Sequence, residues 1–168
     1  SKNVDYGWLF NTRFNVLRKA FNRFVKNDDY YEFLKRSDYW LTDYATFMAL
    51  KEKNNYKDWL NWDVLDVNEE DLEFWYFIQY LFDKQWNDVL KYAHDNGITI
   101  IGDMPIYVAL DSVDVWMNKS DFLLDKDNYP TLVAGCPPDG FSPDGQLWGN
   151  PIYNWEKMKQ DNFSWWIK

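Results

Sequence analysis

Two features of the sequence carry side chains that could act on a ligand: an aspartate inside an apolar stretch, and a loop that combines large rings with helix and strand breakers. Asp103 lies within ITIIGDMPIYVAL, residues 98–110. A carboxylate buried in so apolar a stretch is costly unless it is paired or hydrogen-bonded. Polar side chains at the carboxyl ends of strands build the active sites of α/β barrels, whereas a structural aspartate would tie down a neighbouring loop. The spacing alone favours neither interpretation.

The loop is GCPPDGFSPDGQLWGNPIYNW, residues 135–155, which holds four of the six prolines and four of the seven glycines in the chain. Prolines fix backbone φ angles, and glycines permit tight turns. Phe141 and Trp148 add ring faces, while Asp139, Gln146 and Asn150 add hydrogen-bond donors and acceptors. A preorganised binding loop has this makeup, but so does a rigid structural Ω-loop whose rings pack on the body. Composition leaves both interpretations open.

The other candidate residues are weaker, and the sequence does not contain the residues that several common kinds of catalytic site require. Asp111 and Asp114 in ALDSVDVW are better explained as residues that cap or solvate the start of a helix than as functional carboxylates. The single histidine, His94, lies near an expected helix end, so a Ser/His/Asp triad has no credible histidine. With one histidine and one cysteine, the sequence has no His/Cys cluster of the kind that binds a metal ion. The stretch GDMPIY lacks the spaced glycines of a phosphate-binding loop.

Composition and charge narrow the class of partner. The chain has 168 residues, enough for one domain with a sizeable core, and a net charge of −9. Such a surface repels phosphate backbones, so we expect no nucleic-acid partner. Aromatic residues make up 21% of the chain, and ring faces together with carboxylates suit a neutral, hydroxyl-rich ligand. No apolar run approaches a membrane span, no signal peptide opens the chain, and the single cysteine, Cys136, fits a reducing cytosol. We therefore expect a cytoplasmic protein without a membrane partner.

The periodicity predicts helices over the first hundred residues and a change of structure after Gly97. Helical stretches are expected over 12–27, from Tyr30 behind an N-cap at Asp28 or Asp29, over 37–54 and over 69–96. Residues 98–110 are nearly continuously apolar, which predicts a strand covered on both faces, as in a parallel sheet. A short helix at 112–118 with Asp111 or Ser112 as its N-cap, a β-hairpin over 122–135 and a helical start at 155–168 should follow. Because one parallel strand cannot form a sheet alone, the chain either dimerises or is a piece of a larger α/β protein.

The sequence resembles the amylomaltase, or 4-α-glucanotransferase, family over nearly its whole length. Three stretches carry the resemblance: QYLFDKQWNDVLKYAHDNGITIIGDMPIYVALDSVDVW, FLLDKDNYPTLVAGCPPDGFSPDGQLWGNPIYNW and the final WWIK. It implies an α/β fold, a fragment of a (β/α)₈ TIM barrel with helical insertions. Residues 1–96 would be a mainly helical subdomain, and residues 97–168 would supply the third barrel strand, a hairpin, the groove loop and the start of a helix. Together they would make one incomplete catalytic domain.

The activity that the resemblance implies is transfer of α-1,4-glucan segments between maltooligosaccharides or starch chains. A retaining double displacement by a carboxylate nucleophile and a carboxylic acid/base performs it, with no metal or organic cofactor. Asp103 would lie near the cleaved sugar, Asp111 and Ser112 match the family's motif after that strand, and residues 137–151 would arch over the groove. The expected acceptor-side wall comprises Phe141, Gln146, Trp148, Gly149 and Asn150. Gly140 departs from the family, which often has a larger side chain there, so one glucan contact is in doubt.

The family's nucleophile, in an Arg-x-Asp motif after the WW helix, and its acid/base have no counterpart in these 168 residues. None of the carboxylates is therefore expected to be catalytic. We expect an internal fragment that is inactive alone, binds α-1,4-glucan weakly at best and can self-associate through unpaired strand edges. The alternative is a carbohydrate-binding or regulatory module derived from the enzyme.

Overall fold

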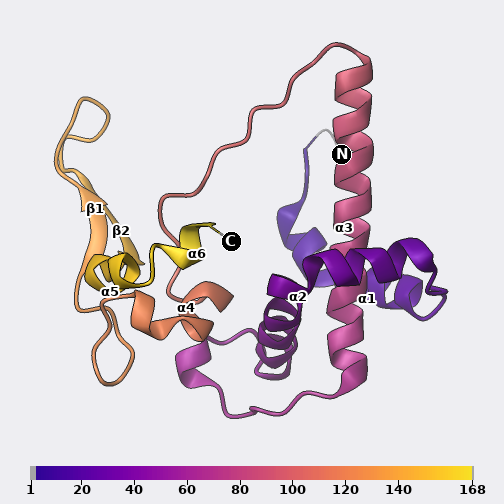
Figure 1. The fold of residues 1–168 in the computed structure, drawn as a ribbon, viewed down its shortest axis with the longest axis horizontal. Coiled ribbons are helices and arrows are strands. Elements are labelled where there is room, and N and C mark those ends of the chain that lie inside the picture. The colour runs from indigo at the N-terminus through magenta and orange to yellow at the C-terminus, as the bar shows by residue number, and fades with distance from the viewer. Residues whose placement is uncertain (1–2, 168) are drawn as a thin grey trace. The chain divides into compact units, whose positions relative to one another are not determined.

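The computed structural model describes residues 3–167, which form two compact units. The helical unit comprises residues up to 53 together with 64–101, and the hairpin unit comprises 54–63 together with residues from 102 onward. The helical unit contains α1 (Tyr6–Phe21), α2 (Asp28–Lys53) and α3 (Glu69–Asp95), as Figure 1 shows. The hairpin unit contains η1 (Trp59–Asn61), α4 (Val113–Met117), η2 (Lys119–Asp121), β1 (Val133–Cys136), β2 (Gln146–Pro151), α5 (Trp155–Gln160) and α6 (Ser164–Ile167).

The core of the helical unit is built mainly from aromatic rings on α2 and α3, which pack against each other. Tyr30 and Tyr80 meet edge to face with ring centroids 5.3 Å apart, and Phe24 lies against both rings. Such ring pairs contribute about 0.5–1.5 kcal/mol beyond the area that they bury. The members of this core that are at most 4% exposed include Tyr30, Phe33, Leu41, Phe47, Phe74, Trp75, Phe77 and Tyr80.

The ends of α3 agree with the sequence prediction to within one residue. The helix starts at a reciprocal cap: the Asn68 side chain accepts from the Asp71 N–H at 2.9 Å, and the Asp71 carboxylate accepts from the Asn68 N–H at 3.3 Å. It ends where Gly97 takes a φ of 72°, with Ile98 N–H bonded to the Ala93 carbonyl at 2.9 Å. This is the Schellman arrangement that a glycine after the last turn favours.

The other helix starts differ from the predictions. Helix α1 begins at Tyr6 because Asp5 caps it, accepting from the Trp8 N–H at 2.9 Å. The predicted N-cap of α2 at Asp28 or Asp29 is wrong, since the side chain that accepts from the Tyr30 N–H, at 2.9 Å, belongs to Asn27. The two aspartates lie instead in the first turn, where negative charge suits the helix dipole. The helix then continues without a break to Lys53.

The predicted strand over 98–110 is not a strand in the structure. Residues 98–110 form no ladder, and Figure 1 shows them as an extended segment after α3. Ile101 is 91% exposed and Ile106 is 71% exposed, so these two apolar side chains lack the cover that a buried strand would give them. The physical reason is that a strand needs hydrogen-bonding neighbours, and within residues 3–167 the two strands β1 and β2 pair only with each other.

The antiparallel hairpin lies later in the chain than the predicted one over 122–135, because its paired strands are β1 and β2. Residues 122–131 make a turn closed by an isolated bridge between Leu124 and Pro130, and Phe122 forms a second isolated bridge with Tyr153. Strand β1 pairs antiparallel with β2, in the register of Gly135 opposite Leu147. Of the helices in the described part of the chain, none has the length and apolar character needed to cross a bilayer.

The predicted short helix and the predicted C-terminal helical start are confirmed. Ser112, one of the two predicted caps, accepts from the Val115 N–H at 3.3 Å and starts α4. The C-terminal stretch forms two short helices, α5 and α6, instead of one. They are separated because Asn162 and Phe163 have left-handed φ angles of 58° and 57°.

Candidate functional site

The loop between β1 and β2, residues 137–145, is held by its own hydrogen bonds. The Asp139 carboxylate accepts from the Phe141 and Ser142 N–H groups at 2.9 and 2.8 Å, and the Ser142 hydroxyl donates to the Gly145 carbonyl at 2.7 Å. Gly145 has a φ of 72°, and a Cβ there would lie 2.6 Å from a backbone oxygen, so only glycine fits. Phe141 is 97% exposed. The loop is therefore preorganised without packing this ring on the body.

Strand β2 bulges where it carries Trp148. Three residues, 148–150, lie between the paired positions Leu147 and Pro151, opposite one residue of β1. Gly149 takes a φ of 79° inside this bulge, a conformation that suits glycine. Bulges re-aim side chains, and the Trp148 indole donates to the Gln146 side-chain oxygen at 3.1 Å. The Trp148 side chain is about half exposed, so a ring face is available to a ligand.

Two long-range contacts join this bulge to the segment that follows Asp103. The Asn150 amide donates to the Val108 carbonyl at 2.9 Å. The Tyr107 ring lies 6.1 Å from Trp148 and stacks on Tyr153, with centroids 6.0 Å apart and planes at 12°. We call the surface formed by Tyr107, Gln146, Trp148 and Asn150 the Trp148 face.

The anchor of the Trp148 face is Tyr153, which is 1% exposed. Its ring centroid lies 5.2 Å from Phe122 and 5.1 Å from Trp166, so it connects the hairpin to the C-terminal helices. Sequence reasoning missed Tyr107 and Tyr153 as positioning residues. Both follow a Pro-Ile pair, but this local likeness gives no indication that the two rings stack.

Asp103 is exposed, in an extended segment, and makes no hydrogen bond or ion pair to another described residue. The desolvation argument for a functional aspartate, which assumed burial in a strand, therefore does not apply to this structure. Asp114, the weaker candidate, is half-buried beneath the rings. Burial raises the pKa of its carboxyl, against the opposing effect of hydrogen bonds that include one from the Trp165 indole. Asp114 is thus a partly buried residue of the hairpin unit.

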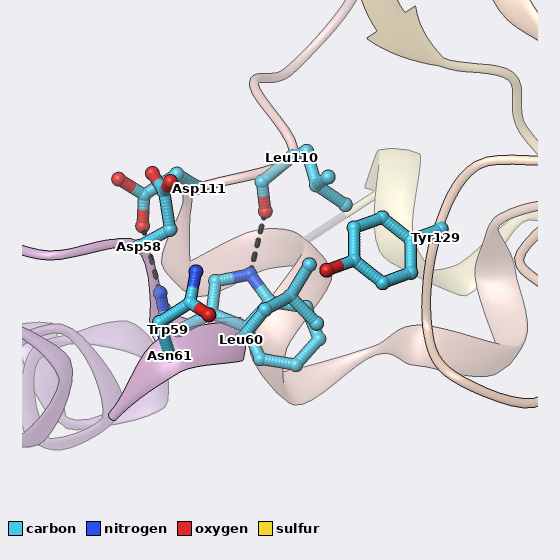
Figure 2. Close-up of a pocket in the computed structure, with 7 residues that line it drawn as sticks. All are labelled: Asp58, Trp59, Leu60, Asn61, Leu110, Asp111 and Tyr129. Atoms are coloured by element: carbon cyan, nitrogen blue, oxygen red, sulfur yellow. Dashed lines mark hydrogen bonds between the residues drawn. The ribbon is translucent and has the colours of Figure 1, made fainter. Parts of the chain in front are cut away.

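The neighbouring residues Ser112 and Asp111 have different structural surroundings. Ser112 is the N-cap of α4, a structural role. Asp111 lines a small cavity of about 170 Å³, and its carboxylate accepts from the Trp59 N–H at 3.4 Å. Figure 2 shows the seven residues around this cavity, which are Asp58, Trp59, Leu60, Asn61, Leu110, Asp111 and Tyr129. The structure thus brings together Gln146, Trp148, Gly149 and Asn150 in one place and puts Asp111 beside another.

Three comparisons with known proteins bear on this site. A family model described as 4-alpha-glucanotransferase matches residues 1–168. The 4-alpha-glucanotransferase of Clostridium butyricum is 44% identical over 98% of this chain and 37% of its own length, and that of Aquifex aeolicus is 42% identical over 97% and 36%. The chain thus spans little more than a third of the length of these curated relatives.

Solved structures agree with the sequence relatives. The amylomaltase from Streptococcus agalactiae, solved in complex with acarbose, is 45% identical, with a TM-score of 0.82 over 98% of this chain and 37% of that one. The amylomaltase from Corynebacterium glutamicum is 24% identical, with a TM-score of 0.68 over 90% of this chain and 21% of that one, which is a likeness of fold alone.

Proposed function

The chain belongs to the 4-alpha-glucanotransferase family, and we propose on this premise that the protein transfers α-1,4-glucan segments between maltooligosaccharides. In this proposal residues 3–167 supply part of the glucan groove of a (β/α)₈ barrel. Residues 1–96 are its helical subdomain, and residues 97–168 form the wall of the groove. The reaction takes place in the cytoplasm without a metal or organic cofactor.

The main structural support for this proposal is the exposure and fixed position of the Trp148 ring on the Trp148 face. A half-exposed indole ring is fixed by a hydrogen bond to Gln146 and by contact with Tyr107. The C–H surface of a pyranose packs on such a ring, while amide groups exchange hydrogen bonds with its hydroxyls. Fixing the ring before the sugar arrives reduces the ordering cost of binding.

The other predicted site residues take supporting roles in this proposal. Asn150 keeps the strand and the segment after Asp103 together, so that the Asp103 carboxylate can hydrogen-bond a sugar hydroxyl beside the Trp148 face. Phe141, the exposed ring on the loop, closes over bound glucan and excludes water. Gly149 permits the bulge that aims Trp148. Asp111 and Ser112 hold the segment that follows.

The chemistry is a retaining double displacement. A carboxylate attacks the anomeric carbon while a carboxylic acid protonates the leaving oxygen, and the 4-hydroxyl of a second glucan then displaces the enzyme carboxylate. We assign neither carboxylate role to a residue of this chain. The residues described here bind and orient glucan, and shielding the intermediate from water favours transfer over hydrolysis.

The test has two arms. In the complete transferase, Trp148→Ala should raise the KM for maltotriose about tenfold, equivalent to ~1.4 kcal/mol of lost binding. Trp8→Ala, at a tryptophan 62% exposed on α1, is the matched control and should leave KM unchanged. Residues 1–168 alone should release no glucose from maltotriose. Release above the blank by the pure chain would mean that its own carboxylates are catalytic.

A further inference from the structure

The cavity beside Asp111 has room for a six-membered ring, while the hydroxyl groups of a hexose would extend to its open rim. Its volume is about 170 Å³, and an engineered protein cavity of about 150 Å³ holds one benzene molecule. Two separate stretches, 58–61 and 110–111, enclose it together with Tyr129. All seven lining residues belong to the hairpin unit, and none belongs to the Trp148 face.

The floor of the cavity is a locked aromatic ring. Trp59 is 8% exposed, and its indole N–H donates to the Leu110 carbonyl at 2.7 Å, the bond drawn in Figure 2. Its backbone N–H donates to Asp111, and the Lys119 ammonium lies 5.1 Å from the ring centroid. Because these contacts already fix the ring, it loses little conformational freedom when a ligand binds against it.

The walls combine apolar surface with hydrogen-bonding groups at opposite ends. In Figure 2 the carboxylates of Asp58 and Asp111 gather at one end, and the Tyr129 hydroxyl points in from the other. Leu60 and Leu110 provide apolar surface between these ends. A flat ring with C–H faces and several hydroxyls on its rim matches this alternation.

The charge and composition of the lining disfavour anions and metal ions. Two carboxylates repel phosphates and acidic sugars. Within residues 3–167 no cluster of three or more His, Cys, Asp or Glu side chains could hold a metal ion. A neutral ring with hydroxyl donors is therefore the class that the lining favours over an anion or a metal.

We propose that this cavity binds a single neutral hexose ring, as a second sugar site that shares no residue with the Trp148 face. That the hexose is a glucosyl residue of a glucan rests on the proposed function, whereas the hexose class rests on the cavity alone. A second site of this kind holds one end of a glucan, or free glucose, while the Trp148 face engages another part.

The test is a titration with glucose and, separately, with maltotriose, followed by the NMR signals of the Trp59 and Trp148 indole N–H groups. Glucose should shift the Trp59 signal saturably. Asn61→Trp places an indole in the cavity from an exposed position and should abolish this shift. Tyr129→Ala should weaken glucose binding about tenfold. Tyr92→Ala, at a tyrosine 72% exposed on α3, is the matched control and should change nothing.

This experiment distinguishes the cavity beside Asp111 from the Trp148 face. Trp148→Ala should leave the glucose response of Trp59 intact, so a failure of the proposed glucan groove would not remove it. An unchanged Trp59 signal at saturating glucose, or a glucose response that survives Asn61→Trp, would overturn the second site. A response to ammonium or calcium without a response to glucose would overturn it as well, because it would assign the cavity to a cation.

Discussion

Replacing Tyr153 with phenylalanine should stabilise the protein. The side chain is 1% exposed, and within the part of the chain that the structure describes its hydroxyl has no hydrogen-bond partner. Burying a hydroxyl without a partner costs about 1–3 kcal/mol by mutational measurements. Phenylalanine removes this cost and keeps the ring that stacks on Tyr107. We expect the free energy of unfolding to rise by about 1 kcal/mol, a melting-temperature increase of about 2–4 °C for a chain of this size.

A second tyrosine provides a matched control with the opposite sign. Tyr80 is 4% exposed, and its hydroxyl donates to the Asp29 carboxylate at 2.8 Å. A hydrogen bond to a charged group contributes about 1.5–3 kcal/mol. Tyr80→Phe removes the same atom, leaves Asp29 without this donor, and should lower the free energy of unfolding by about 1.5 kcal/mol.

The pH dependence gives Tyr153 a further signature. Burial, helped by the charge of Asp114, raises the pKa of Tyr153 above its ordinary value. The folded state therefore holds the phenol proton more tightly than the unfolded state. This contribution to stability is complete below pH ~10, the pKa of the unfolded side chain, and is lost as the pH rises toward the folded pKa. The advantage of Tyr153→Phe should widen above pH 10.

The assay is urea unfolding of the wild-type protein and both variants, monitored by circular dichroism, at pH 7 and above pH 10. Opposite signs for the two substitutions at pH 7 would support the reasoning. If Tyr153→Phe lowered the free energy of unfolding as Tyr80→Phe does, the Tyr153 hydroxyl would have a favourable partner, and the argument from its burial would fail.

Three further predictions concern the site, the helical unit and the hairpin. Asn150→Leu removes the bond to the Val108 carbonyl and should weaken maltotriose binding several-fold by calorimetry; unchanged affinity would exclude a positioning role. Asp71 makes an ion pair with Lys53 at 2.7 Å, and despite desolvation its pKa is lowered by this pair and by the helix-cap hydrogen bond. Asp71→Asn should therefore destabilise at pH 7, and the difference should shrink as the pH falls below the ordinary pKa of the carboxyl and through its lowered folded pKa; a difference that stayed constant as the pH fell would contradict this. Gly135→Ala would place a Cβ 2.5 Å from a β2 carbonyl oxygen and should cost about 1–3 kcal/mol in denaturant unfolding; a neutral result would show that the strands can separate without loss.

The sequence predicted best those elements whose signals lie within a few neighbouring residues. The limits of α3 follow from an acidic first turn and from Gly97, and the α4 cap follows from Ser112. The strand over 98–110 failed because apolarity reports what a segment can bury, whereas strand formation depends on neighbours that the segment does not contain. The α2 cap failed because Asn27 and Asp28 are adjacent, and both side chains can cap a helix.

In the candidate site too, the local features could be predicted from the sequence, whereas the long-range contacts could not. Gln146 and Trp148 are two positions apart in β2, and the glycine that allows the bulge is next to them, so composition indicated this part. The hydrogen bond from Asn150 to Val108 spans 42 positions. The stack of Tyr107 on Tyr153 is also long-range, and packing determines both contacts. The predicted roles in binding glucan all remain predictions; they concern Asp103, Asp111, Ser112, Phe141, Gln146, Trp148, Gly149 and Asn150.

The measurement that tests the central claim most directly is the affinity of this chain for a maltooligosaccharide before and after Trp148→Ala, with Trp8→Ala as the matched control. We predict weak, saturable binding that becomes about tenfold weaker in Trp148→Ala, as expected for ~1.4 kcal/mol of ring contact, and is unchanged in the control. Equal affinities for the wild-type chain and Trp148→Ala would contradict the claim that the Trp148 face binds glucan.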